Sequence, residues 1–473
     1  MASFYVQNFG CRATQAEGAA IERQLEERGL ARASDAANAE IVVLNTCTVT
    51  ASADRDARTA IRRVNRENPH ARIVVTGCYA QRAPEELAAL PGVAQVIGNS
   101  HKHLLAEIAF TDHAAAAHPT KASQNRKCAD AFVPLSRLTT STSLAASLNK
   151  NYSSPIFVSD IFAHTELLAA PVFDAANERT RPNLKVQDGC DNRCSFCVIP
   201  FVRGQSRSLK LDEILREVDA LVTAGYRELV ISGINLGRWG RDLGAALRFE
   251  DLVQAILENS GLEKLRISSV EPMDWSDELI SLVANSPRIA KHAHVPMQSG
   301  SDAVLRRMHR KYRPWHYRER VEKIRAAMPT AAIGADVMVG FPGETDAEFD
   351  ETLHMVTTLP FTYLHVFTYS ARPGTPAVQM KKQVRSQVAS ERNRMLRELA
   401  SEKKLAFMRS FVGKRLDAIT LNERDSESTE CLTDNYLPLR LRGQHQANHW
   451  FPVRTESVRE GKLMGAVDAE SAL

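Results

Sequence analysis

Three cysteines in the middle of the chain, Cys190, Cys194 and Cys197, have the spacing that points most directly to chemistry. Thiols separated by three and by two residues can wrap one corner of an iron–sulfur cubane. Closed clusters take four thiolates, so a set of three leaves one iron open to a further ligand. A structural zinc site is the alternative, but it needs a fourth Cys or His at a suitable spacing, and none follows nearby.

A second set of cysteines, Cys11, Cys47 and Cys78, is spread over the first part of the chain, and each follows a segment with strand-like sequence. Stretches with helical composition and a charged face lie between these segments, so residues 1–111 predict an α/β unit with a parallel sheet. The predicted strands are residues 3–8, 40–45 and 72–77, and the predicted helices are 16–28 and 52–67. Ligands bind at the carboxyl ends of parallel strands, so three cysteines distant in sequence could meet at one point.

The Cys190 set follows the first of six further strand-like segments, which alternate with helical ones over residues 181–375. Strands are predicted at 184–187, 228–232, 264–270, 293–297, 333–339 and 364–369, with helices such as 211–224 and 249–259 between them. Six strand–helix repeats predict an open parallel β/α barrel. Because the site of such a barrel lies at the carboxyl ends of its strands, the three cysteines are expected at its functional face.

The remaining segments predict a linker, a basic helix and a small β-barrel. Residues 112–180 are rich in Ala, Ser, Thr and Asn without sustained periodicity, and we interpret them as a low-complexity linker or insertion. Residues 381–415 predict a helix with eleven Lys or Arg and three Glu, a net charge of +8 that suits a solvated face or phosphate contacts. This helix and the β/α barrel are assigned to residues 181–411, and a small antiparallel β-barrel to 412–473. Its strands are predicted at 416–421, 428–432, 437–442, 450–457 and 463–467.

Three aromatic residues of the predicted small barrel, Tyr436, Trp450 and Phe451, could stack on nucleic-acid bases, although isolated aromatics are more often barrel core. Two cysteines stand outside both sets. Cys431 lies in a predicted strand and Cys128 in the predicted linker, and we interpret both as inert thiols.

Composition excludes several classes of protein. The 473 residues contain 60 Lys or Arg and 56 Asp or Glu, a formal charge of +4 that excludes a histone-like protein but not a local basic patch. Eight cysteines in a chain of this length argue against a disulfide framework. The first residues lack the regions of a signal peptide, and no apolar run reaches the ~18 residues of a membrane span. The cytoplasm is therefore the expected compartment.

The Cys-x3-Cys-x2-Cys spacing after the first barrel strand resembles the radical S-adenosylmethionine superfamily. The resemblance implies a 4Fe–4S cluster on Cys190, Cys194 and Cys197, whose open iron binds the amino and carboxylate groups of S-adenosylmethionine. One-electron reduction then cleaves the sulfonium and yields a 5′-deoxyadenosyl radical.

Other segments are similar to the methylthiotransferase branch of that superfamily, namely residues 45–50, 75–81, 184–190, 198–204 and 206–208. The resemblance implies that Cys11, Cys47 and Cys78 hold an auxiliary 4Fe–4S cluster, again with an open iron, that supports sulfur transfer. The tail near residues 412–468 resembles the TRAM domain, a small β-barrel that binds tRNA.

The same resemblance implies a set of residues around S-adenosylmethionine, at or near the ends of barrel strands. They are Ser232, Gly233, Asn235, Glu271, Gln298, Ser299, Arg310 and Asp336. A glycine beside the methionine amine is reasonable, because bare backbone can approach a ligand closely. No catalytic residue is assigned beyond the two clusters.

Within the branch, the runs around Cys47 and Cys190 are most similar to the group that modifies N6-threonylcarbamoyladenosine in tRNA. This implies replacement of the C2 hydrogen of the adenosine at tRNA position 37 by a methylthio group. The implied partners are tRNA, an electron donor such as flavodoxin or ferredoxin, and a sulfur source. Two alternatives within the branch are N6-isopentenyladenosine in tRNA and a ribosomal-protein aspartate. An alternative of another class is a non-catalytic RNA-binding protein with structural metal sites.

Overall fold

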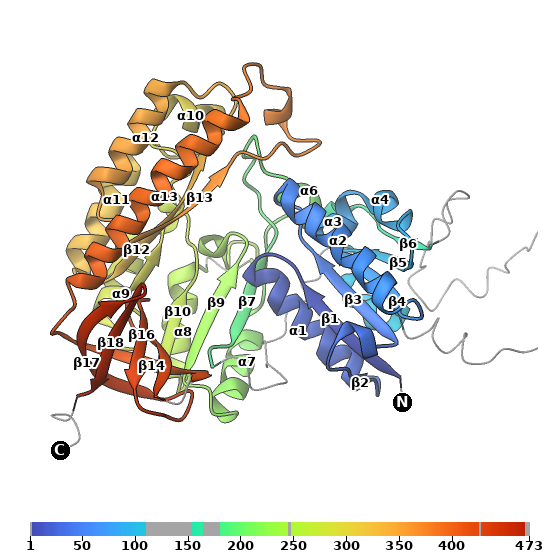
Figure 1. Ribbon diagram of the computed structural model, residues 1–473, viewed down its shortest axis with the longest axis horizontal. Helices are drawn as coiled ribbons and strands as arrows, with labels where there is room; N and C mark the ends of the chain where they lie inside the picture. Colours follow the sequence, from blue (N-terminus) through green and yellow to red (C-terminus); the bar gives the residue numbers. More distant parts are fainter. Residues whose placement is uncertain (1, 110–153, 164–179, 245–246, 425–426, 469–473) are drawn as a thin grey trace, which may run out of the picture. The chain divides into compact units, whose positions relative to one another are not determined.

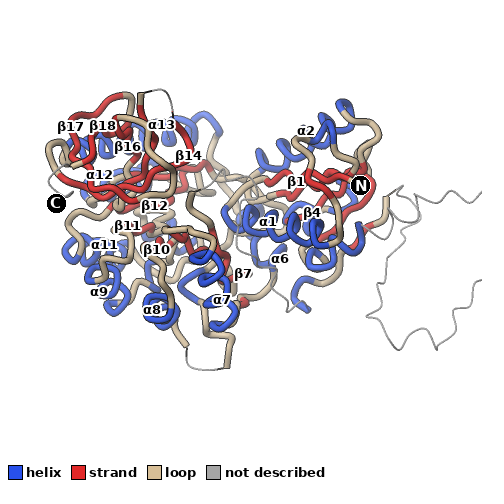
Figure 2. Tube along the Cα trace, turned by 90° about the horizontal axis from the view of Figure 1, so that it is seen from below, coloured by secondary structure: helices blue, strands red, loops and turns tan. Residues whose placement is uncertain are grey.

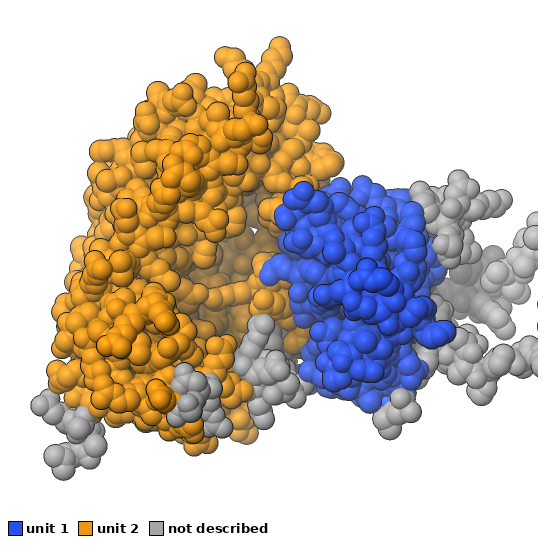
Figure 3. Space-filling model, viewed as in Figure 1, with its two compact units in different colours: residues 1–10, 21–48, 52–164 blue, residues 11–20, 49–51, 165–473 orange. Residues whose placement is uncertain are grey.

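The chain divides into two units in a computed structural model that describes residues 2–109, 154–163, 180–244, 247–424 and 427–468. The first unit consists of Met1–Gly10, Ile21–Thr48 and Ser52–His164, and the second of Cys11–Ala20, Val49–Ala51 and Thr165–Leu473 (Figure 3). Two short segments from the amino-terminal part of the sequence therefore belong with the second unit. Cys128 lies outside the described residues.

A parallel sheet of six strands, in the order β2-β1-β3-β4-β5-β6, forms the first unit (Figure 1). Its strands are β1 (Ser3–Asn8), β2 (Ala31–Arg32), β3 (Ile41–Thr46), β4 (Arg72–Gly77), β5 (Val93–Gly98) and β6 (Ile156–Phe157). The helices of this part of the sequence are α1 (Arg12–Glu27), α2 (Ala51–Glu67), α3 (Cys78–Arg82) and α4 (Pro84–Ala88). β3 is buried over its whole length, which is typical of a parallel strand with both faces covered.

The predicted α/β unit with a parallel sheet is confirmed. The strands at 3–8 and 72–77 have the predicted bounds, and the strand predicted at 40–45 is shifted by one residue. The strands β2, β5 and β6 are not predicted from sequence. β6 lies inside the segment 112–180, which the sequence predicts to be a linker or insertion, and it pairs in parallel with β5. A two-residue strand is too short to show a period in sequence, so only the pairing reveals it.

Six parallel strands in the second unit form the predicted open β/α barrel. They are β7 (Asn183–Asp188), β9 (Glu228–Gly233), β10 (Lys264–Ile267), β11 (His292–His294), β12 (Ala332–Val339) and β13 (Tyr363–Thr368). The ladder is divided into β10-β9-β7-β8 and β11-β12-β13, with isolated bridges at Leu265–Ile289 and Ser269–His294 between the two parts. β8 (Arg207–Ser208) adds an antiparallel edge to β7.

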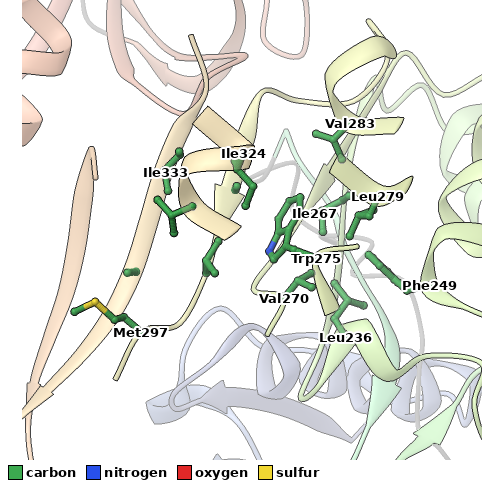
Figure 4. Packing of buried hydrophobic residues seen from close by; sticks show 14 of the residues in the cluster. Leu236, Phe249, Ile267, Val270, Trp275, Leu279, Val283, Met297, Ile324 and Ile333 are labelled. Atoms are coloured by element: carbon green, nitrogen blue, oxygen red, sulfur yellow. The ribbon is translucent and has the colours of Figure 1, made fainter. Parts of the chain in front are cut away.

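Helices cover the outer face of this barrel (Figures 1 and 2). They are α7 (Leu211–Thr223), α8 (Phe249–Asn259), α9 (Asp277–Asn285), α10 (Asp302–Arg307), α11 (Pro314–Ala327) and α12 (Asp346–Thr358). The short helix α6 (Ile199–Arg203) follows β7 instead, and its first residue faces the inside of the barrel. Figure 4 shows Phe249, Trp275 and Leu279 close to Ile267 of β10, and all four side chains are buried in one apolar cluster. This layer lies between strands and helices, so the inner face of the strands is free to line a cavity.

Five strands close into a small barrel in the order β14-β15-β16-β18-β17. They are β14 (Arg415–Arg424), β15 (Ser428–Thr433), β16 (Pro438–Arg442), β17 (Trp450–Arg459) and β18 (Lys462–Val467). The small barrel is confirmed, but the prediction that it is antiparallel is wrong at one pairing, because β16 and β18 run parallel. An odd number of strands cannot alternate in direction around a closed ring, so one parallel pair is unavoidable.

The turn between β15 and β16 packs on the amino-terminal end of the β/α barrel. Arg266 Nη1 donates to the Asp434 carbonyl oxygen at 3.1 Å, and Asn435 Nδ2 donates to the Thr330 carbonyl oxygen at 3.0 Å. Arg266 also forms an ion pair with Glu228 at 2.6 Å, and neither side chain is exposed. Because Glu228 is the first residue of β9, the small barrel contacts the larger one beneath the start of its strands.

The predicted basic helix is α13 (Ser386–Arg409), which is shorter than the predicted range 381–415. Some of its charge is neutralised within the protein. Arg392 is buried and pairs with two carboxylates outside the helix, Glu344 at 2.6 Å and Asp346 at 2.7 Å. The net charge of +8 therefore overstates what this helix could offer to phosphates. Although α13 is 24 residues long, no described helix combines the length and the apolar character that a membrane crossing requires.

Candidate active site

The loop after β7 carries Cys190 and has one defined shape. Gly189 has a φ of +71°, and a Cβ at this position would lie 1.8 Å from the Gln205 carbonyl oxygen, so only glycine fits. The Cys190 backbone N–H donates to the Gly204 carbonyl oxygen at 3.1 Å, and Gln187 Nε2 donates to the Gly189 carbonyl oxygen at 2.9 Å. Cys190 is thereby fixed at the carboxyl end of the first barrel strand.

Two polar side chains contact the sulfur atoms of the central cysteines. Arg310 Nη1 donates to Cys194 Sγ at 3.3 Å, and Asn235 Nδ2 donates to Cys190 Sγ at 3.6 Å. Burial raises the pKa of Cys190 and raises the pKa of Cys197 to about 12. These thiols are therefore protonated at neutral pH unless a metal takes them as ligands, since a coordinated thiol is deprotonated outright.

The N–H donors to Cys190 and Cys194 fit ligands of an iron–sulfur cluster, in which hydrogen bonds to the sulfurs tune the reduction potential. The second guanidinium nitrogen of Arg310 donates to the carboxylate of Glu271, which holds the guanidinium against Cys194.

A cavity of about 640 Å³ lies inside the barrel. Its walls are residues of β9, β11, β12 and β13, the loops after β9 and β10, and the segments around Cys11 and Val49 that belong to the same unit. Six of the eight residues predicted to surround S-adenosylmethionine line this cavity: Ser232, Gly233, Asn235, Glu271, Gln298 and Asp336. The volume is in the usual range for a site that takes a small-molecule cofactor.

Unsatisfied polar atoms in the cavity wall fit a polar cofactor. Ser232 Oγ and Asn235 Oδ1 are buried and have no hydrogen-bond partner among the described residues. Gly233 lies between them, and a Cβ at that position would lie 2.9 Å from Gln187 Oε1, so the backbone must remain bare here. Because buried polar atoms are nearly always paired, these two await a ligand with matching donors and acceptors.

The other two predicted residues do not line the cavity. Ser299 Oγ lies 3.1 Å from Thr352 Oγ1 and accepts from the Ser301 backbone N–H at 3.1 Å, so its hydroxyl shapes the loop after Gln298. Arg310 is buried beside Cys194, as described above. Neither side chain therefore faces the cavity: Arg310 lies against the cysteines, and Ser299 points into the protein interior.

An aromatic wall on β11 and β13 is not predicted from sequence. His292, His294, Tyr363 and His365 line the cavity, and His294 and Tyr363 are stacked with ring centroids 5.9 Å apart. Burial lowers the pKa of His292 and of His365, so both rings are neutral at pH 7. Alternate residues of a strand point to one side, so the patterns His-Ala-His at 292–294 and Tyr-Leu-His at 363–365 were the available signal.

The amino-terminal cysteines belong to different units, Cys47 and Cys78 to the first and Cys11 to the second. Cys47 and Cys78 follow the neighbouring strands β3 and β4, whose last residues Thr46 and Gly77 are in register. Both are buried, and Asn99 Nδ2 donates to Cys78 Sγ at 3.6 Å. Cys11 is exposed and lines the cavity of the second unit. That the three cysteines share one cluster stays a prediction.

A buried ionic network, also missed from sequence, joins the start of α1 to the barrel. Lys185 Nζ lies 2.9 Å from Glu17 Oε1 and 3.1 Å from Asp188 Oδ2. Arg203 Nη1 lies 2.6 Å from Glu17 and 2.9 Å from Asp188. Arg207 Nη2 also lies 3.7 Å from Asp188 Oδ2, and the pairing of these opposite charges makes their burial tolerable.

The aromatic residues of the small barrel have separate positions. Tyr436 lines the cavity, and its ring centroid is 4.4 Å from that of His292. Phe451 packs against the core of the small barrel, and Lys264 Nζ lies 5.2 Å from the ring centroid of Trp450. Cys431 is buried, and burial raises its pKa to about 12, which agrees with the predicted burial of this thiol.

Comparison with known proteins identifies the family. Residues 184–356 match the model of the radical SAM superfamily, and residues 3–98 match the model described as uncharacterized protein family UPF0004. The threonylcarbamoyladenosine tRNA methylthiotransferase MtaB of Bacillus subtilis is 35% identical over 447 residues, which are 94% of this chain and 91% of that protein. The chain belongs to the radical S-adenosylmethionine methylthiotransferase family. The resemblance found from sequence is thus confirmed, and with it the two 4Fe–4S clusters and S-adenosylmethionine as cofactors of this methylthiotransferase.

Two further matches add to this. The tRNA-2-methylthio-N(6)-dimethylallyladenosine synthase of Parafrankia sp. is 34% identical over 421 residues, 88% of this chain and 77% of that protein. Among solved structures, the radical S-adenosylmethionine methyltransferase TsrM of Kitasatospora setae has a TM-score of 0.52 at 16% identity. That match covers 80% of this chain and 77% of TsrM, and it supports the fold of the methylthiotransferase.

Proposed function

We propose that this methylthiotransferase replaces the C2 hydrogen of N6-threonylcarbamoyladenosine at tRNA position 37 by a methylthio group. One observation carries the choice of substrate: the similarity to MtaB of Bacillus subtilis extends over 91% of that protein. The small carboxy-terminal barrel, a TRAM-like fold by its five closed strands, would hold the tRNA.

Within this proposal the cysteines have two roles. Cys190, Cys194 and Cys197 would hold the cluster that binds S-adenosylmethionine, and Cys11, Cys47 and Cys78 would hold the auxiliary cluster. When bound, these groups supply a 5′-deoxyadenosyl radical and a sulfur atom, respectively. Cys11 is exposed and lines the cavity of the second unit, which supports its proposed role as a ligand of a cluster with an open iron.

The residues of the cavity would bind and orient the cofactor. Ser232 and Asn235 offer buried, unpaired oxygen atoms, and Gly233 lets the backbone approach. Glu271, Gln298 and Asp336 line the same space. Ser299 and Arg310 would act as positioning residues: Ser299 shapes the loop after Gln298, and Arg310 fixes Glu271 and contacts Cys194.

The remaining partners follow from the chemistry. Reductive cleavage needs a one-electron donor such as flavodoxin or ferredoxin, and each turnover consumes a sulfur atom that a sulfur source must replace. We place this reaction in the cytoplasm, where tRNA is modified. We also propose four segments for the chain, with the amino-terminal domain at 1–111, a linker or insertion at 112–180, the radical core and basic helix at 181–411, and the TRAM-like barrel at 412–473.

Nucleoside analysis of tRNA tests the proposed reaction. In a strain that lacks the gene, 2-methylthio-N6-threonylcarbamoyladenosine should disappear and its unmethylthiolated precursor should accumulate. The wild-type gene should restore the product, and a gene with Cys190, Cys194 and Cys197 changed to Ala should not. Persistence of the product would refute the proposal. Loss of the methylthio derivative of isopentenyladenosine instead would support isopentenyladenosine as the substrate. The 34% identity to the Parafrankia enzyme makes this the second candidate.

A further inference from the structure

Arg12, the first residue of α1, brings a positive charge to the cavity wall. Its Nη2 donates to the Tyr436 hydroxyl at 3.5 Å, and no described carboxylate lies within ion-pair distance of its guanidinium. Its place is nevertheless fixed, because the Arg12 carbonyl oxygen accepts from Asn183 Nδ2 at 3.0 Å. The buried network around Glu17 holds the following turn of the same helix.

Neither acidic residue of the same cavity forms an ion pair with Arg12. Glu271 accepts from Arg310, and Asp336 Oδ1 lies 3.4 Å from His294 Nε2 without a hydrogen bond between them. The charge of Arg12 is therefore without a counter-ion among the described residues. Cationic side chains in partly buried sites are usually paired, so an unpaired guanidinium facing a cavity indicates an anionic ligand.

The surroundings of Arg12 indicate what kind of anion this is. The hydroxyl that it contacts belongs to Tyr436, whose ring lies 5.6 Å from Tyr363 and 4.4 Å from His292 by their centroids. Neutral aromatic side chains of this type stack on unpaired bases. A base in the cavity with a carboxylate on its edge would satisfy both the aromatic wall and the guanidinium.

We propose that Arg12 binds the carboxylate of the N6-threonylcarbamoyl group and thereby selects this nucleoside over one with an apolar N6 substituent. The inference rests on the proposed function and names the group that recognises its substrate. A guanidinium donates two parallel N–H bonds to a carboxylate, and the pair is strong where water is excluded. An isopentenyl group in the same place would leave the charge unpaired, which a site built for a polar substituent rejects.

Binding of anticodon stem-loops to the reconstituted holoenzyme tests this. Three RNAs that differ only at position 37 carry threonylcarbamoyladenosine, its carboxylate methyl ester, or unmodified adenosine. The wild-type protein should bind the first about 10- to 100-fold more tightly than the other two, as expected for a charge-assisted pair. Arg12→Met should remove this preference, and Arg12→Lys should retain part of it. The same loss should appear in KM more than in kcat.

Arg23→Met is the matched control, because Arg23 lies on the same helix and pairs with Glu27 on the surface. It should retain the full preference. An equal loss of affinity for all three RNAs in Arg12→Met would overturn the inference and indicate a phosphate contact instead. If Arg12→Met does not fold, the ester RNA still tests the idea, since wild-type protein that binds ester and acid equally refutes it. Failure of the proposed function is distinct, because the wild-type protein would then form no methylthio product from the first RNA.

Discussion

Glu17 Oε1 lies 2.9 Å from Lys185 Nζ, although 168 residues separate them, and both side chains are almost completely buried. The contact joins α1 to the first barrel strand, and Arg203 and Asp188 complete it. Cys11 and Arg12 stand at the start of the same helix. The network therefore does more than stabilise the barrel, because it fixes the segment that carries a predicted cluster ligand to the cavity wall.

Glu17→Ala should destabilise the second unit by about 3–5 kcal/mol, because it leaves Lys185 and Arg203 with one buried carboxylate between them. Urea titration followed by circular dichroism measures this. Glu27→Ala, which removes an exposed partner of Arg23 on the same helix, should have little effect. Equal stability of the two variants would show that the network is not needed for folding.

Replacing Cys190, Cys194 and Cys197 by Ala should lower the iron content of the anaerobically reconstituted protein from about eight to about four atoms per chain. Formation of 5′-deoxyadenosine on reduction should be abolished. The control is Cys431→Ala, since Cys431 is buried in the small barrel and should affect neither measurement. Iron that stays near eight in the triple variant would contradict two separate clusters.

Arg310→Met should lower the midpoint potential of the cluster at Cys190, Cys194 and Cys197. A positive charge beside Cys194 stabilises the cluster that has gained an electron, so its removal makes reduction harder. A redox titration followed by electron paramagnetic resonance gives the potential, and the iron content should remain about eight. Arg306→Met, which removes an exposed arginine paired with Asp302, is the control. A shift to higher potential in Arg310→Met would be inconsistent with this role.

His292 should make the protein less stable as the pH falls below about 6.5. Burial, with Arg266 and His294 nearby, lowers its pKa well below the usual value, so the folded state keeps the ring neutral while the unfolded state takes up a proton. The free energy of unfolding should then fall by up to about 1.4 kcal/mol per pH unit until the folded pKa is reached. His292→Gln should flatten this slope in urea titrations between pH 7 and 5, whereas His309→Gln, a change at an exposed ring, should not.

The features that could be predicted from the sequence are those that depend on residues close together in the chain. The buried strand β4 follows from a run of apolar residues, and a ligand-binding loop after β7 follows from the spacing of its three cysteines. Neighbours in sequence can still face opposite ways: Gln298 has a φ of +63° and lines the cavity, whereas Ser299 points into the interior. Contacts across long separations, such as Glu17 with Lys185, depend on the tertiary fold and leave no periodic signal.

The position of the β15–β16 turn has a consequence for how such enzymes diversify. Tyr436 is part of the cavity wall, and the carbonyl oxygen of Asp434 accepts from Arg266 at 3.1 Å. The carboxy-terminal barrel is therefore not an adaptor that can be exchanged freely between relatives. A chimaera that takes this barrel from another family member would also replace the part of the cavity wall that Tyr436 forms. A relative could acquire a new RNA preference and keep its activity only if Tyr436, Arg266 and His292 were inherited together.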